Sequence, residues 1–110
     1  MSDFGVLLKF SKNNVSLNGD DLLIISTALK NIVTNGNYPS NITDGNYLPL
    51  KLWENGVYVS VITEYYLGEN EKELRQLAQE EDLSNAEAII YDLKNILDID
   101  INMSAQIEDW

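Results

Sequence analysis

The chain has 110 residues, 45% hydrophobic and 23% charged, which suits one domain with a hydrophobic core and is too apolar for intrinsic disorder. It carries eighteen acidic and seven basic residues, a net charge of −11, and neither histidine nor cysteine. This composition excludes a disulfide-stabilised scaffold, thiolate and imidazole metal sites, and nucleophiles that depend on histidine or cysteine.

The N-terminal part of the chain predicts a strand followed by a helix. Apolar residues alternate with others over residues 4–10, which is typical of a strand with one buried face. Residues 15–17 are expected to fold back as a short partner strand. A helix then begins near Asp20 and Asp21, where acidic side chains meet the positive end of the helix dipole, and it ends at Asn35-Gly36.

The middle of the chain predicts a β-hairpin. Residues 47–53 and 57–66 are rich in β-forming side chains, and Asn55-Gly56 between them suits a type I′ turn, which requires positive φ. Alternation along the second strand puts its residues on two faces. One face has Val57, Val59, Val61, Thr63 and Tyr65, and the other has Tyr58, Ser60, Ile62, Glu64 and Tyr66.

The C-terminal part predicts two helices and a closing strand. The first helix spans about 71–80, and the second begins at Ser84, which has capping-box spacing with Glu87 and precedes a clear apolar stripe. Residues 98–103 alternate as a strand. The whole pattern predicts a single α+β domain over residues 1–110, with a mainly antiparallel sheet of four to five strands and about three helices packed on one face.

No motif in the chain indicates an enzyme. The glycines are scattered singly, so no phosphate-binding loop is expected, and no serine or lysine lies in a recognisable catalytic motif. Asp98, Asp100 and Asn102 have the spacing of a calcium loop, but Met103 stands where that loop needs glycine, and the alternation favours a strand. We therefore expect no catalytic residue, no metal and no cofactor.

The negative charge is concentrated after residue 68. Residues 69–110 contain twelve acidic and three basic residues, whereas residues 1–68 contain six and four. Such a field disfavours direct binding to nucleic acid or to an anionic membrane, because both are negatively charged. The chain has neither a signal-peptide pattern nor an apolar run long enough to span a bilayer, so a cytoplasmic location is expected.

The acidic side chains have two interpretations: they solvate a surface helix, or they attract a basic protein partner. The second interpretation predicts a non-enzymatic binding protein that neutralises its partner, for instance a toxin nuclease. In composition the chain is similar to small acidic bacterial immunity proteins and phage-encoded inhibitors. The alternative is a structural or assembly subunit of a phage or secretion apparatus that acts through homo-oligomer contacts. The candidate partner-binding residues are Glu69, Glu71, Glu73, Glu80, Glu81 and Asp82, with Trp53, Tyr58 and Tyr66 as aromatic anchors.

Overall fold

The structure is a computed structural model of the chain, and it describes residues 3–35, 50–53, 57–66 and 70–109. Four strands, three α-helices and one π-helical turn follow one another in the described residues. In chain order they are β1 (Asp3–Ser11), α1 (Gly19–Asn35), β2 (Leu50–Trp53), β3 (Val57–Tyr66), α3 (Glu71–Leu77), the π-helical turn η2 (Ala78–Asp82), α4 (Leu83–Ile96) and β4 (Asn102–Asp109).

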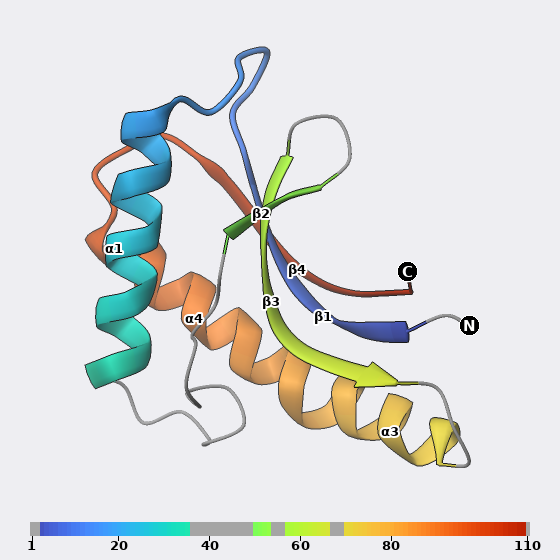
Figure 1. The fold of residues 1–110 in the computed structure, drawn as a ribbon. Coiled ribbons are helices and arrows are strands. Elements are labelled where there is room, and N and C mark those ends of the chain that lie inside the picture. The colour runs from blue at the N-terminus through green and yellow to red at the C-terminus, as the bar shows by residue number, and fades with distance from the viewer. Residues whose placement is uncertain (1–2, 36–49, 54–56, 67–69, 110) are drawn as a thin grey trace.

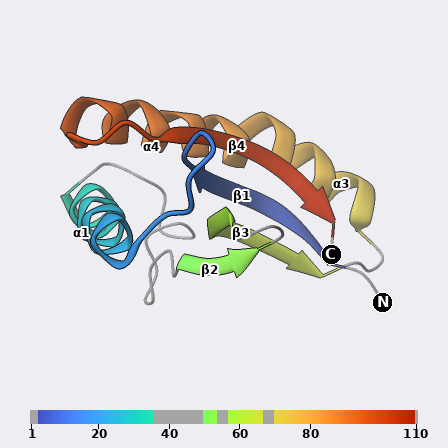
Figure 2. The same ribbon diagram turned by 90° about the horizontal axis from the view of Figure 1, so that it is seen from above.

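The strands form one antiparallel sheet in the order β2-β3-β1-β4. The three long strands β3, β1 and β4 make up the body of the sheet, and β2 adds four residues at one edge. The sheet is strongly twisted, so the strands cross one another in projection (Figure 1). Seen from above, β4 and β2 are the outermost strands (Figure 2). The N-terminal strand therefore lies at the centre of the sheet, between β3 and β4.

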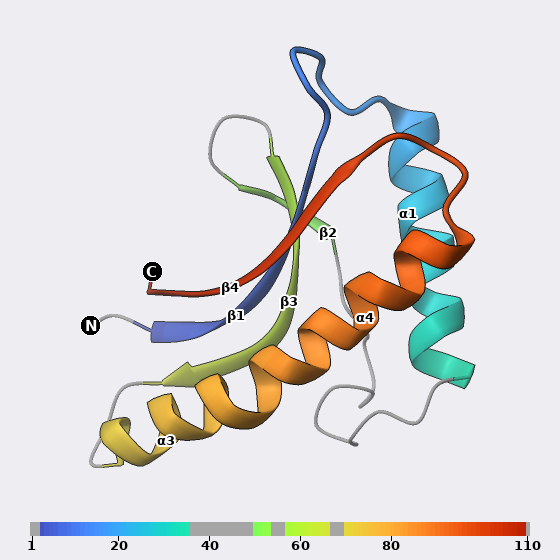
Figure 3. The same ribbon diagram turned by 180° about the vertical axis from the view of Figure 1, so that it is seen from behind.

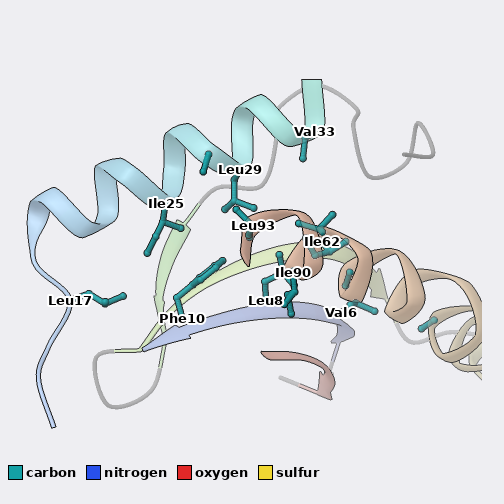
Figure 4. Packing of buried hydrophobic residues seen from close by; sticks show 14 of the residues in the cluster. Val6, Leu8, Phe10, Leu17, Ile25, Leu29, Val33, Ile62, Ile90 and Leu93 are labelled. Atoms are coloured by element: carbon teal, nitrogen blue, oxygen red, sulfur yellow. The ribbon is translucent and has the colours of Figure 1, made fainter. Parts of the chain in front are cut away.

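The hydrophobic core lies between one face of the sheet and the helices. Alternation along β1 turns Phe4, Val6, Leu8 and Phe10 to this face, and all four are fully buried. In close view, Ile25 and Leu29 of α1 and Leu93 of α4 point toward Leu8 and Phe10 of β1 (Figure 4). Residues of α1, α4 and β1 share this core cluster, which agrees with the prediction that the helices pack on one face of the sheet.

Helix α1 begins as the sequence predicts, through a reciprocal pair of side-chain caps. The Asp21 N–H donates to Asn18 Oδ1 at 2.8 Å, and the Asn18 N–H donates to Asp21 Oδ2 at 3.1 Å. Lys12 Nζ lies 2.8 Å from the same carboxylate. The Lys12 bond is the main reason why the pKa of Asp21 is held below its ordinary value, and the Asn18 N–H adds to it. The strand expected at 15–17 is absent from this described segment, where an isolated bridge joins Lys12 and Val15.

A β-bulge in β3 changes which side chains share a face. Val6 pairs with Thr63 and Leu7 with Val61, so Ile62 is an extra residue in β3. Tyr58 and Tyr65 consequently both pack against the core cluster, although strict alternation predicted them on opposite faces. The hairpin partner β2 pairs Trp53 with Val57, and the turn at residues 54–56 lies outside the described residues.

The two helices predicted at the C-terminal part form one continuous helical segment, residues 71–96, called here the long helix (Figure 3). Ala78, Asp82 and Leu83 all keep right-handed helical φ and ψ at the junctions, so the expected helix start at Ser84 is wrong. The closing strand was also expected too early. It begins at Asn102, and Ile99 and Ile101 pack against the core from the connecting loop before it.

The α+β class and the antiparallel sheet are confirmed, but the detailed count of four to five strands and three helices is not. Three long strands with a short edge strand face two helical segments, α1 and the long helix. In the described residues, no helix has the length and apolar character needed to cross a membrane.

Candidate functional site

The outer side of the long helix carries a stripe of exposed polar and acidic side chains. Its positions are three or four residues apart, so they follow one side of the helix, away from the sheet. They are Glu73, Gln76, Glu80, Ser84, Glu87 and Tyr91, and every one of them is exposed. We call this set the outer stripe. Glu81 is exposed beside it. In the described part of the chain, no ion pair joins any glutamate of the outer stripe to a basic side chain.

The π-helical turn η2 explains how the inner side of the long helix stays on the sheet. Ala78, Asp82, Ala86 and Ile90 are all buried although they are four residues apart. In an α-helix a spacing of four drifts by about 40° per step, which would turn one end of this row away from the sheet. In η2 the Leu83 N–H donates to the Ala78 carbonyl, five residues earlier, and the extra residue offsets part of that drift.

The same turn carries Asp82 into the interior. Asp82 is 3% exposed and accepts a hydrogen bond from the hydroxyl of Tyr65 on β3. Burial, followed by the Asp82 carboxylate, raises the pKa of Tyr65 well above its ordinary value. The Tyr65 ring stacks on Phe4 with centroids 5.1 Å apart. This pair joins the long helix to the sheet.

Arg75 makes a second connection between the long helix and the sheet. Its guanidinium binds Asp109 of β4 through two nitrogens, at 3.0 and 3.1 Å, and it also binds Glu71 at 2.9 Å. It lies 4.4 Å from the centre of the Phe4 ring. The pKa of Arg75 is raised above its ordinary value, first by the hydrogen bonds to Asp109 and then by the hydrogen bond to Glu71. Glu71 and Asp109 are thus partly neutralised at this end of the sheet.

The structure separates the acidic residues that the sequence grouped. Glu73, Glu80 and Glu81 are exposed, whereas Glu71 is held by Arg75. Asp82 does not belong with the exposed acids, because it is buried and bonded to Tyr65. Glu69 lies outside the described residues.

The predicted aromatic anchors differ in how much of each the structure describes. Tyr58 is half-buried against the core, so only part of its ring can reach a partner. The side chains of Trp53 and Tyr66 lie outside the described part of the structure. Tyr91 is the exposed tyrosine of α4, with 67% of its surface accessible, and the sequence-based list omitted it. It could have been found, because it lies opposite the apolar stripe of its own helix.

The segment with calcium-loop spacing is not gathered into a site. Among the described residues, no group of three or more histidine, cysteine, aspartate or glutamate side chains could hold a metal ion. Asn102 is instead bonded to Asn13, at 2.8 Å between its Nδ2 and Asn13 Oδ1.

A second surface lies where α1 passes the end of α4. Leu23, Ile24 and Ile96 are exposed there by 67, 41 and 54%, beside a hollow of about 420 Å³. Exposed apolar groups of this kind offer contact area to another protein. The described residues thus form an acidic stripe on the long helix and an apolar patch at α1 and the end of α4. Comparison of the chain with protein-family models, with curated proteins and with solved structures finds no match.

Proposed function

We propose that this protein is a non-enzymatic binding protein that captures a basic protein partner through the outer stripe of the long helix. The observation that carries the proposal is the exposure of Glu73, Glu80 and Glu87 on one side of the helix, none of them in an ion pair with another described residue. The partner would present lysine and arginine side chains, as the nucleic-acid-binding surface of a toxin nuclease does. Covering that surface would neutralise the partner.

The electrostatic part of the proposal concerns the rate of association. The net charge of −11 lies mostly after residue 68, and the outer stripe displays part of it along about five turns of helix. Exposed charges of one sign steer an oppositely charged protein and raise its association rate, and salt screens them over about 8 Å at physiological ionic strength. Because no described basic side chain forms an ion pair with the glutamates of the outer stripe, these carboxylates are available to the partner.

The contact part of the proposal concerns Tyr91. It lies one helical turn after Glu87 and is the large exposed side chain of the outer stripe. Tyrosine supplies a large contact area for little loss of side-chain freedom, and it is enriched among residues that dominate binding energy. We therefore expect the glutamates to determine how fast the partner arrives and Tyr91 to determine how long it stays.

The test compares the wild-type chain with two variants in affinity capture from cells of the source organism. In the first, Glu73, Glu80, Glu81 and Glu87 are all replaced by glutamine; in the second, Tyr91→Ala is made alone. Wild type should retain a basic protein that mass spectrometry identifies. The glutamine variant should bind it with a slower association rate and weaker salt dependence, and Tyr91→Ala should release it faster.

A matched control replaces the same number of acids elsewhere. Asp20 and Glu64 are exposed but lie outside the outer stripe, and their change to asparagine and glutamine lowers the charge as much as the two-residue stripe variant Glu80→Gln, Glu87→Gln. If this control slows association as much as the stripe variant does, net charge acts and the stripe has no special part. Capture that is indifferent to both variants, or that yields only copies of this chain, contradicts the proposal.

A second candidate function rests on the apolar surface at Leu23, Ile24 and Ile96. It is the assembly alternative, in which copies of the chain associate through α1 and the end of α4. Sedimentation at increasing protein concentration tests it. Self-association that Leu23→Ser abolishes and that added salt strengthens would favour assembly, because salt suppresses repulsion between anionic copies. A monomer at all concentrations would reject it.

A further inference from the structure

Strand β4 is an outermost strand with an unpaired edge. Its eight residues pair with β1 in continuous register, from Asn102 opposite Ser11 to Asp109 opposite Phe4. No other described strand pairs with it, since the sheet ends there. In Figures 1 and 3 no drawn strand runs along its outer side. About half of its backbone N–H and C=O groups therefore face away from β1.

This edge lacks the features that usually prevent pairing with another chain. Exposed edge strands are commonly protected by proline, lysine or a bulge. The five residues from Met103 to Ile107 contain no charge and no proline, and the register with β1 has no bulge. The described bulge lies between β1 and β3, on the side of β1 away from β4. Within Met103–Ile107 the outer edge of β4 thus lacks charge, proline and bulge.

The surroundings of the edge favour a positively charged occupant. Asp98 and Asp100 are exposed just before β4, whereas the Asp109 side chain at its other end, although 53% exposed, is bound by Arg75. One end of a strand added to β4 would lie beside the Asp98 and Asp100 carboxylates. A second copy of this chain would bring its own net charge of −11 to the same place, so electrostatic repulsion opposes pairing of β4 with β4.

We propose that an extended, lysine- or arginine-bearing segment of the basic partner adds to the outer edge of β4 as a new strand of the sheet. This rests on the proposed function, because it takes the partner to be basic, and it adds the mode of recognition. Backbone hydrogen bonds to β4 supply affinity, and alternate side chains supply specificity. On the helix side the new strand meets Met103 and Ile107; on the other side it meets Ser104 and Gln106.

The test uses the wild-type protein and a matched pair of peptides. The probe is an eight-residue peptide of alternating lysine and valine, blocked at both ends, which places valine beside Met103 and Ile107 and lysine on the opposite side. Its control has the same sequence and charge but an N-methyl group on every backbone nitrogen, so neither of its edges can complete the backbone pairing. Amide hydrogen exchange of the labelled protein is measured by NMR with each peptide at saturation.

With the unmodified peptide, amides of β4 that face outward should exchange at least about tenfold more slowly, and the N-methylated peptide should give no such protection. If both peptides bind equally and protect nothing in β4, strand addition is wrong while attraction by the outer stripe stands. If neither peptide binds, strand addition is also wrong, and the capture experiment decides the outer stripe separately. Protection of β4 in the free protein that grows with its concentration would make a second copy the occupant and overturn the proposal.

Discussion

Removing the hydroxyl of Tyr65 should destabilise the protein through a single buried contact. The Tyr65→Phe variant keeps the ring, and so keeps its stacking on Phe4, but it takes the donor away from Asp82. Asp82 is 3% exposed, so water reaches its carboxylate poorly after the change. The variant therefore isolates the cost of leaving a buried carboxylate without this hydrogen bond.

The size of the effect follows from the charge of the acceptor. A hydrogen bond to a charged group contributes about 1.5–3 kcal/mol, so Tyr65→Phe should lower the free energy of unfolding by about 2 kcal/mol at neutral pH. For a domain of this length that corresponds to a fall in Tm of roughly 8 °C. Urea denaturation followed by far-UV circular dichroism measures the free energy, and a thermal scan measures Tm.

A double-mutant cycle separates this contact from changes elsewhere. The cycle combines Tyr65→Phe with Asp82→Ala, and the coupling energy between the two should be about 1–2 kcal/mol. If the two changes are additive, the hydroxyl does not act through Asp82 and the reasoning is refuted. A cost of Tyr65→Phe within about 0.5 kcal/mol of zero would refute it as well.

The same contact makes a prediction about pH. The pKa of Tyr65 in the folded protein is raised above the ordinary value of 10.0, chiefly by burial and then by Asp82. A raised pKa means that the folded state holds the proton more tightly, so this contribution to stability is complete below pH 10 and is lost as pH rises beyond it. The stability difference between wild type and Tyr65→Phe should shrink above that pH, and an unchanged difference would contradict the assignment.

Four further predictions concern the helices. Asn18→Ala should cost about 1 kcal/mol through loss of the N-cap, as measured in urea. The pKa of Asp21 is lowered in the folded protein, so wild type should be more stable than Asp21→Asn above about pH 4. The difference in stability should vanish as acid protonates Asp21, and a difference that persists at pH 2 would contradict this. Leu93→Ala, at a fully buried position, should lower the free energy of unfolding by about 2–5 kcal/mol. Ile96→Ala on the same helix should change it by no more than about 0.5 kcal/mol, because Ile96 is 54% exposed. Equal losses would contradict the assignment of Leu93 to the core. Arg75→Lys should recover only part of the stability that Arg75→Met loses, because an ammonium group cannot bind the Asp109 carboxylate through two parallel bonds.

Much of the fold could be predicted because it depends on local patterns. Alternation over residues 4–10 predicted β1, and the acids near Asp21 predicted the start of α1. The Asn55-Gly56 pair predicted the antiparallel pairing of β2 with β3. Each of these features involves residues close in the sequence, whose preferred φ and ψ or shared face follow from their own side chains.

The errors arose where a local signal competed with a tertiary contact. Ser84 has the spacing of a capping box, yet it lies inside the long helix, because η2 allows the helix to continue with Asp82 bonded to Tyr65 seventeen residues away. The faces of β3 could not be predicted either, since the bulge at Ile62 is seen only in its register with β1. The candidate site was half predictable: the exposed glutamates follow from helix periodicity, but the burial of Asp82 does not.

The sequence by itself determined the α+β class, the absence of histidine and cysteine chemistry, and an acid excess concentrated after residue 68. These depend only on composition and on the periods of helix and strand. Tertiary structure alone decided which acids are exposed and unpaired among the described residues. Asp82 is buried and Glu71 is held by Arg75, whereas Glu73, Glu80 and Glu87 remain exposed. The physical reason is that burial and ion pairing depend on contacts between residues distant in the chain, which the charge of a side chain does not encode.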